Sequence, residues 1–320
     1  MITKEPFKPA WWLFNGHLQT IWPTLVRRTI PLATHPERLE LPDGDFLDLA
    51  WTGPKHGPIV IVLHGLAGCI ESPYVNGILH SIIKNNWRGL FVHFRGCSGI
   101  PNRLPRFYHS GETGDLDYVI AHLRKREPNT PLAAVGYSLG GNVLVKWLSK
   151  HNTVNPLTAA VAISVPFELN KASKQLNSGF SRFYQWYLLR SLRRIVQAKF
   201  KKGPAPIAIK DLGKLDTFEK FDDQVTAPLH GFADAQDYYF QASSRSDLKK
   251  IIVPTLILQA RDDPFVPVDV NPEPRELAAC VTFELHETGG HVGFVTGNMP
   301  WQPVYWLEQR ITDYLKKHLK

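Results

Sequence analysis

Residues 132–143, LAAVGYSLGGNV, place Ser138 in a G-x-S-x-G frame between an apolar, strand-like run and a helix-like run. A nucleophile elbow needs this strand, turn and helix context, because the turn exposes the serine hydroxyl at the end of the strand. Gly136 and Gly140 lack Cβ atoms, so they permit a sharp turn and a strained serine backbone. The stretch therefore predicts an α/β fold and makes Ser138 the candidate nucleophile of a serine hydrolase.

Strand-like apolar runs alternate with helix-like segments on both sides of this stretch. Such alternation predicts a mostly parallel, doubly wound sheet. The strand-like runs are 59–63, 89–94, 132–135, 157–163, 251–258 and 281–285, and the helix-like segments are 74–86, 115–127 and 301–320.

The start of the chain predicts a different arrangement. Residues 38–41 and 45–51 read as two strands, and Asp43-Gly44 between them is a turn signal, so we expect an antiparallel N-terminal hairpin. The first 35 residues, 1–35, are rich in Trp and Pro and are expected to form an arm that packs across a single domain of residues 1–320.

The alternation stops after Val165-Pro166 and resumes only at Ile251, a gap too long for one crossover connection. Residues 170–202 within it contain nine Lys or Arg, no Asp or Glu, and six aromatic residues. This composition predicts an inserted helical cap over about 166–235, with aromatic side chains packed inward and basic side chains facing water.

Composition limits the class of protein. The chain has 320 residues, of which 43% are hydrophobic, and a formal net charge of +8, which is moderate for this length and favours solubility over nucleic-acid binding. Cys69, Cys97 and Cys280 are odd in number and widely spaced, so we expect neither a disulfide framework nor a zinc site. We therefore expect the protein to be located in the reducing cytoplasm. The apolar run at 11–14 is too short for a secretory signal, and no run is long enough to span a bilayer.

A serine nucleophile needs a histidine base and an acid, and in an elbow-type hydrolase they follow in the order Ser, Asp, His. Asp262 and Asp263 follow a strong strand-like run, and His291 lies in a glycine-rich loop after the last one. We favour Asp263 as the acid because it directly precedes Pro264, and Asp262 stays open as an alternative or as a brace of the turn. His286 is a weaker candidate base, because it lies at the end of the predicted strand.

Acyl transfer also needs donors for the developing oxyanion. The strand-like run ending at Leu63 leads into His64-Gly65-Leu66, where the backbone N–H of Leu66 is one candidate donor, and the N–H of Leu139 is the other. His64, His93 and His109 lie near predicted strand ends, and we expect structural or substrate-positioning roles for them.

Several longer motifs resemble those of the YheT-like branch of the α/β-hydrolases, which is related to plant embryogenesis-associated proteins. They lie at 14–22, 64–68, 94–99, 109–113, 136–142, 228–232, 262–264 and 290–294, so the resemblance covers nearly the whole chain. It implies an α/β-hydrolase fold, Ser138, Asp263 and His291 as charge-relay residues, hydrolysis of carboxylic esters or acylglycerols, and no metal or organic cofactor. The H-x-x-x-x-D acyltransferase signature of some relatives is absent.

Two other classes of function stay open. A hydrolase scaffold can serve a binding or regulatory protein without turnover. The basic, aromatic insertion can also serve as a nucleic-acid or membrane surface. We expect a small-molecule or lipid ester as the substrate, no nucleic-acid partner and a transient contact of the basic cap with membrane surfaces, while the sequence does not fix acyl-chain length or oligomeric state.

Overall fold

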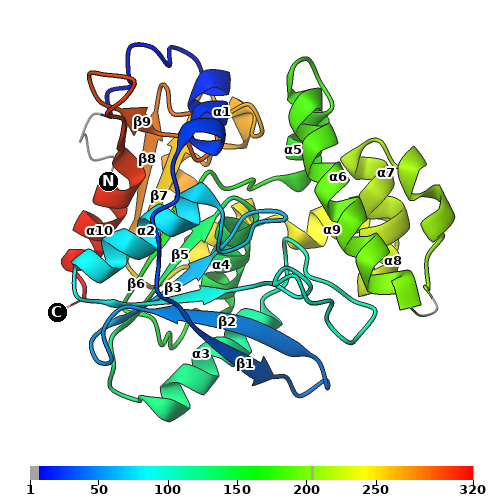
Figure 1. Ribbon diagram of the computed structural model, residues 1–320, viewed down its shortest axis with the longest axis horizontal. Coiled ribbons are helices and arrows are strands. Elements are labelled where there is room, and N and C mark those ends of the chain that lie inside the picture. The colour runs from blue at the N-terminus through cyan, green and yellow to red at the C-terminus, as the bar shows by residue number, and fades with distance from the viewer. Residues whose placement is uncertain (1–6, 203–204, 320) are drawn as a thin grey trace.

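An eight-stranded sheet forms the centre of the computed structural model, which describes residues 7–202 and 205–319 (Figure 1). The strands lie in the order β1-β2-β4-β3-β5-β6-β7-β8. Their bounds are β1 His35–Glu40, β2 Phe46–Thr52, β3 Ile59–Leu63, β4 Arg88–Val92, β5 Leu132–Tyr137, β6 Ala159–Ile163, β7 Thr255–Ala260 and β8 Val281–His286. β2 pairs antiparallel with both β1 and β4, and all other pairs are parallel. The predicted mostly parallel sheet with an antiparallel hairpin is confirmed.

Helices cover both faces of this sheet. β3 shows why, because Ile59 and Ile61 pack with one buried cluster, whereas Val60 and Val62 pack with another. The first cluster includes side chains of α3 (Gly114–Arg126) and α4 (Leu139–Lys150), and the second those of α2 (Pro73–Lys84) and α10 (Trp306–Lys316). Since successive side chains of a strand point to opposite faces, the sheet is doubly wound as predicted.

Some predicted element bounds are wrong. The closing helix begins at Trp306 and not at 301, because Val304–Tyr305 (β10) pairs with Val295–Thr296 (β9) instead. The run at 251–258 becomes a strand only from Thr255, after Pro254, which has no N–H to donate to a ladder.

The chain between β6 and β7 forms a group of helices beside the sheet (Figure 1). The helices are α5 Leu169–Leu176, α6 Ser181–Lys199, α7 Phe218–Phe221, α8 Ala227–His230 and α9 Ala235–Ala242, with a π-helical turn at Asp222–Thr226. Short 3-10 turns cover Phe200–Lys202, Ile209–Lys214 and Arg245–Lys250 here, and Val268–Val270 and Pro274–Glu276 after β7. Within the described ranges no helix combines the length and the apolar composition needed to cross a bilayer.

The aromatic residues of α6 do not all pack inward, so that prediction is wrong in part. Tyr184 is buried, but Phe180, Phe183, Trp186 and Tyr187 are each 50–56% exposed. The buried stripe of α6 runs through Ser181, Tyr184, Gln185, Leu189 and Val196. Aromatic residues at the intervening positions necessarily lie on another face of the helix.

The N-terminal segment packs against the chain that follows β8. Phe7, Ala10 and Leu13 are buried, and α1 (Gly16–Val26) begins after Asn15, whose side chain caps it by accepting from Leu18 N–H. The buried Gln19 side chain bonds both the N–H and the carbonyl of Val295.

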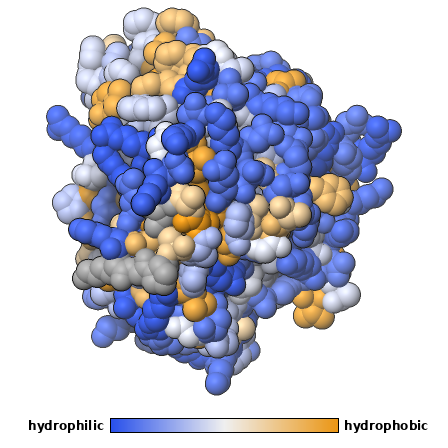
Figure 2. All heavy atoms as spheres, turned by 90° about the vertical axis from the view of Figure 1, so that its right-hand side faces the viewer, coloured by the Kyte–Doolittle hydropathy of each residue, from blue (hydrophilic) through white to orange (hydrophobic). Residues whose placement is uncertain are grey.

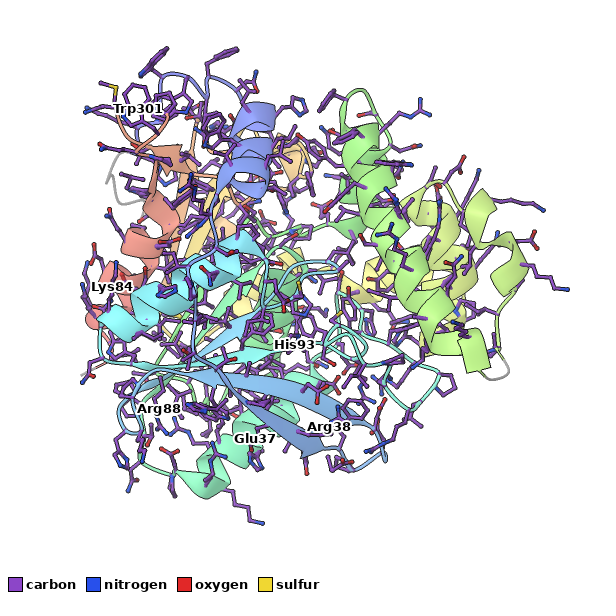
Figure 3. All side chains as sticks on the ribbon, viewed as in Figure 1. Glu37, Arg38, Lys84, Arg88, His93 and Trp301 are labelled. Atoms are coloured by element: carbon purple, nitrogen blue, oxygen red, sulfur yellow. The ribbon has the colours of Figure 1, made fainter. Side chains whose placement is uncertain are left out.

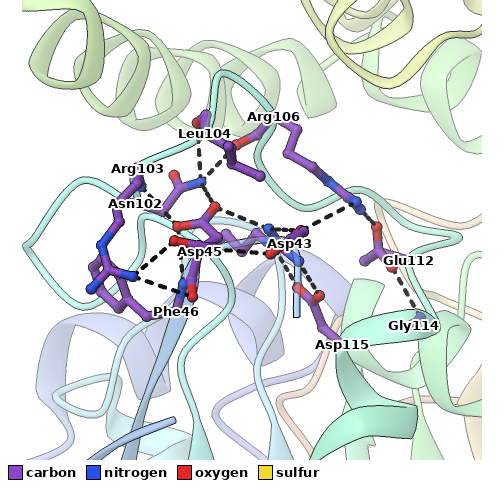
Figure 4. Close-up of polar contacts among 12 residues, drawn as sticks. Asp43, Asp45, Phe46, Asn102, Arg103, Leu104, Arg106, Glu112, Gly114 and Asp115 are labelled. Carbon is purple, nitrogen blue, oxygen red and sulfur yellow. Dashed lines mark hydrogen bonds and ion pairs between the residues drawn. The ribbon is translucent and has the colours of Figure 1, made fainter. Parts of the chain in front are cut away.

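A buried ion network anchors the loop between β4 and α3 (Figure 4). Arg95 pairs with Asp45 and Asp115, and Asn102 donates to the same Asp45 carboxylate. Arg95 and Asp45 are almost inaccessible to solvent, so removal of Arg95 would leave the carboxylates of Asp45 and Asp115 buried without their cation, at a cost of about 3–5 kcal/mol. The network holds this loop, which continues toward residues 107–112, against the sheet.

Candidate active site

Ser138 lies at the turn from β5 into α4, in the backbone conformation expected of an elbow. Its φ of 51° and ψ of −116° are strained for a residue with a Cβ. A Cβ on Gly136 would lie 2.4 Å from the Gly140 carbonyl oxygen, and one on Gly140 would lie 2.5 Å from that of His64. Both glycines are therefore required by close backbone approach.

His291 joins Ser138 to Asp263, although the three residues come from different loops. His291 Nε2 lies 2.9 Å from Ser138 Oγ, and Nδ1 lies 2.8 Å from Asp263 Oδ2 and 3.1 Å from Oδ1. The carboxylate can only accept, so Nδ1 carries the proton and Nε2 is free to accept from the serine hydroxyl. Asp263 and His291 have almost no solvent exposure, which strengthens these contacts.

The structure places the neighbouring candidates elsewhere. Asp262 Oδ1 accepts from the Gly290 N–H at 2.9 Å, so this carboxyl braces the histidine loop, and burial raises its pKa. His286, the last residue of β8, packs against the rings of Phe7 and Trp306. The structure therefore places Asp263 in the hydrogen-bonded series with His291 and Ser138. Asp262 and His286 are not part of that series.

The two candidate oxyanion donors have free N–H groups. In the described part of the chain, the N–H groups of Leu66 and Leu139 make no hydrogen bond, and both residues line the same cavity as Ser138. The amides on either side of Leu66 are already used, because Gly65 N–H donates to Tyr74 OH and Ala67 N–H to Tyr108 OH. Hydrogen bonds thus fix this loop on both sides of Leu66, whose N–H stays available as a donor.

Contacts that the sequence did not reveal fix the histidine loop. His291 N–H donates to Thr20 Oγ1 in α1, and Val292 N–H donates to Ser164 Oγ just after β6. A Cβ on Gly290 would lie 2.5 Å from the Gly16 carbonyl oxygen, so α1 packs directly on this loop. The motif at 14–22, which had no assigned physical role, thereby positions His291.

Phe265 is a second residue missed from the sequence. Its ring stacks parallel on the His291 imidazole, with centroids 4.0 Å apart and 8° between the planes. On its other side Phe265 contacts Tyr184 of α6, whose hydroxyl lies 3.0 Å from His17 Nδ1 in α1. The histidine is therefore linked through ring contacts to the inserted helices and to the N-terminal helix.

His64 and His93 have structural surroundings. His64 is fully buried, donates to the Gly65 carbonyl at 2.6 Å and accepts from Phe94 N–H at 3.1 Å, and burial lowers its pKa to about 3. His93, labelled in Figure 3, follows the end of β4 and packs edge-on against Phe91. His109 lies in the cavity wall.

A cavity of about 830 Å³ lies over Ser138 and is lined mainly by apolar side chains. Its walls include α1, the loops after β3 and β4, the inserted helices and the loops that carry Asp263 and His291. The inserted helices contribute apolar side chains to this lining, among them Leu169, Leu176, Leu188, Phe218 and Phe221. A volume of this order is typical of small-molecule sites, and it is large enough for a drug-sized apolar ligand.

The polar groups around the cavity do not form a metal centre. Across residues 7–202 and 205–319, no group of three or more His, Cys, Asp or Glu side chains is arranged to hold a metal ion. The groups that meet at Ser138 are the serine hydroxyl, the His291 imidazole, the Asp263 carboxylate and the backbone amides.

Comparisons with known proteins agree with this fold. Residues 58–298 match the family model described as the alpha/beta hydrolase fold. The chain is 45% identical to YheT of Escherichia coli (strain K12), over 98% of this chain and 94% of that protein. It is 32% identical to the monoacylglycerol lipase of Saccharomyces cerevisiae, over 74% of this chain and 55% of that protein. The solved esterase Pf2001 of Pyrococcus furiosus is 15% identical and shares the fold with a TM-score of 0.58, over 90% of this chain and 94% of that one.

Proposed function

The chain belongs to the α/β-hydrolase family, in its YheT-like branch, and on this premise we propose that it is a serine hydrolase that cleaves carboxylic esters. The proposal rests on the hydrogen-bonded series of Ser138, His291 and Asp263. His291 Nε2 lies 2.9 Å from Ser138 Oγ, and His291 Nδ1 lies 2.8 Å from Asp263 Oδ2. Ester-cleaving relatives support the same general reaction.

The mechanism begins with proton transfer from Ser138 to His291 Nε2 as the serine oxygen attacks the ester carbonyl. Asp263 holds the imidazole in orientation and stabilises the imidazolium that forms. The tetrahedral intermediate collapses when Nε2–H protonates the leaving alcohol, and an acyl group remains on Ser138. A water molecule then gives its proton to Nε2, attacks the acyl group and releases the carboxylic acid with the free serine.

The N–H groups of Leu66 and Leu139 act as the oxyanion donors in this scheme. Their lack of other partners in the described chain and their position in the cavity wall support that role. Donors fixed before the reaction stabilise developing charge without reorganisation, and one such donor contributes about 3–4 kcal/mol.

The substrate class that fits the cavity is a short-chain ester or an acylglycerol. The mainly apolar lining supports an acyl chain, and the name of the yeast relative supports an acylglycerol.

We also propose that the chain works as one domain, with the arm 1–35 and the insertion 166–235 enclosing the cavity. The free thiols of Cys69, Cys97 and Cys280 favour a cytoplasmic location.

Replacement of Ser138 by Ala tests the reaction. The variant should lower kcat for short p-nitrophenyl esters by about 10⁴- to 10⁶-fold, because the nucleophile is removed while the fold is unaffected. Ser178→Ala, on an exposed serine in the turn between α5 and α6, is the matched control and should keep full activity. Unchanged hydrolysis by Ser138→Ala would overturn the assignment, and a wild-type protein without esterase activity would favour the silent binding alternative.

A second candidate function, contact with a lipid surface, is favoured by the exposed face of α6. Phe183, Trp186 and Tyr187 are half exposed beside the exposed cation Arg190, which lies over the Trp186 ring. Figure 2 shows scattered hydrophobic residues among a mostly hydrophilic surface on this side of the molecule. Aromatic and basic residues together are typical of helices that lie at membrane interfaces.

Vesicle binding tests this second function. We expect the protein to cosediment with phosphatidylcholine vesicles that contain phosphatidylserine, and less so as salt is raised. Phe183→Ser combined with Trp186→Ser should weaken cosedimentation, whereas Phe240→Ser, on the exposed side of α9, should not. Equal binding by all three proteins would contradict a role for α6.

A further inference from the structure

Two motifs that the catalytic scheme leaves unused meet in the wall of the cavity. One contains His109 and the other His230, and their rings lie 4.6 Å apart at an interplanar angle of 65°. Phe232 and Tyr238 contact the ring of His109 from other sides. Since both histidines line the cavity over Ser138, they face the space proposed for the substrate.

The hydrogen bonds of His109 settle which nitrogen carries its proton. Nδ1 accepts from the Gly111 N–H at 3.1 Å, so the proton of the neutral ring is on Nε2. Nε2 lies 3.7 Å from Glu112 Oε2, which is beyond hydrogen-bonding distance. That carboxylate is already held by Arg106 and by the Gly114 N–H (Figure 4). The Nε2–H of His109 is therefore an unused donor in the described part of the chain.

His230 is the second unused group. Neither of its ring nitrogens has a hydrogen-bond partner among residues 7–202 and 205–319. Burial, together with the nearby His109 and Arg106, lowers its pKa to about 3. Burial and the charge of Arg106 lower the pKa of His109 to about 3 as well. Both rings are consequently neutral at any pH at which the enzyme would be assayed.

This neutrality restricts the kind of group that the pair can bind. An anionic group would find no positive charge on either ring, and the nearby cations Arg106 and Lys146 are already paired with Glu112 and Asp247. An apolar group would leave the ring nitrogens buried without partners, which costs about 1–3 kcal/mol for each unsatisfied group. A hydroxyl, which both donates and accepts, satisfies a neutral N–H donor and a neutral nitrogen acceptor.

The pair also lies close to the reaction centre, because the residues on either side of His109 are tied to it. The Tyr108 hydroxyl accepts from Ala67 N–H, beside the oxyanion donor Leu66. The Ser110 carbonyl accepts from the side chain of Asn142, in the first turn of α4 after Ser138. The loop that carries His109 is therefore tied both to the oxyanion loop and to the helix after Ser138, and its ring lines the same cavity as the serine.

We propose that His109 and His230 form a hydroxyl-binding subsite, so that the preferred substrates are esters that carry a free hydroxyl, as a monoacylglycerol does. The inference rests on the proposed ester hydrolysis at Ser138 and names the substrate feature that this cavity selects. The hydroxyl can belong to the alcohol part or to the acyl part of the ester.

Two matched pairs of esters distinguish these sources. Glycerol monobutyrate and propyl butyrate differ by hydroxyls in the alcohol part, and methyl 3-hydroxybutyrate and methyl butyrate differ by one in the acyl part. His230→Phe should lower kcat/KM for the hydroxylated member of at least one pair by about 2- to 13-fold, the value of one hydrogen bond. The unhydroxylated members should change by less than about 2-fold.

His230 is the better position to change, because it makes no hydrogen bond in the described fold. His230→Gln, which keeps a donor and an acceptor, should restore most of the lost preference, whereas Phe232→Leu should affect both members of each pair equally. An equal loss for both members in His230→Phe, or no loss in either pair, would overturn the subsite. Turnover of all four esters must also disappear in Ser138→Ala, and if it persists, the proposed hydrolysis at Ser138 fails instead.

Discussion

Replacement of Asp263 by Asn should leave a folded protein with very little activity. Asp263 accepts from His291 Nδ1–H at 2.8 and 3.1 Å, and this keeps Nε2 unprotonated at 2.9 Å from Ser138 Oγ. If the amide N–H₂ of Asn faces Nδ1, the imidazole must carry its proton on Nε2, where it cannot accept from the serine. The wrong tautomer in a serine hydrolase lowers kcat by about 10⁴-fold, which corresponds to about 5 kcal/mol in activation free energy.

Asp262→Asn is the matched control for this change. The Asn can still accept from Gly290 N–H through its Oδ1, so His291 should keep its position and kcat should fall by less than about 10-fold. The buried Oδ2 of Asp262 has no partner within the described chain, so the amide nitrogen in its place exchanges one unpartnered buried group for another, and the free energy of unfolding should change by at most about 1–3 kcal/mol. Hydrolysis of p-nitrophenyl butyrate and urea unfolding measure the two effects. The reasoning is refuted if Asp263→Asn stays within 10-fold of wild type, or if Asp262→Asn loses as much activity.

Two further predictions concern side chains in the cavity wall. Phe265→Leu removes the ring that stacks on His291 with centroids 4.0 Å apart, and with it about 0.5–2 kcal/mol of imidazolium stabilisation. We therefore expect kcat to fall by about 2- to 30-fold. An unchanged kcat would argue against this role of Phe265. Asp222 is buried against the hydroxyls of Thr226 and Tyr239, and burial raises its pKa to about 6. The folded protein then holds a proton that the unfolded chain releases near pH 4, so this carboxyl lowers stability as the pH rises from about 4 to 6. Asp222→Asn should therefore raise the urea midpoint relative to wild type at pH 7.5 but not at pH 4, and an equal difference at both would contradict the assignment.

The order of the candidate triad residues along the chain could be proposed from sequence because each of their motifs depends on local chemistry. An elbow needs Gly136 and Gly140 around Ser138 within a few residues, and the loops after later strands carry Asp263 and His291 in a fixed chain order. The alternation of strands and helices likewise predicts a parallel sheet. It does not predict that β4 lies between β2 and β3, because crossover connections allow several strand orders.

The missed contacts join segments that are far apart in the chain. Thr20 holds the backbone of His291 across 271 positions, and Gln19 holds Val295 across 276. No local pattern shows such pairs, although glycine at position 290 was a signal, since its lack of a Cβ is what lets α1 approach. The stacking of Phe265 on His291 depends in the same way on how two loops meet.

The faces of α6 show a different limit. Its aromatic residues occur on more than one side of the helix, so composition alone could not tell which would be buried. In the structure Tyr184 packs on Phe265, Phe183 lines the open part of the cavity and Trp186 is half exposed.

Labelling with a fluorophosphonate probe tests the central claim most directly, because the probe reacts only with a serine activated by a working base. Wild-type protein should gain one phosphonyl adduct, located by peptide mass spectrometry on Ser138, and Ser138→Ala should gain none. The account is contradicted if the folded wild-type protein remains unlabelled, or if Ser138→Ala is labelled to the same extent.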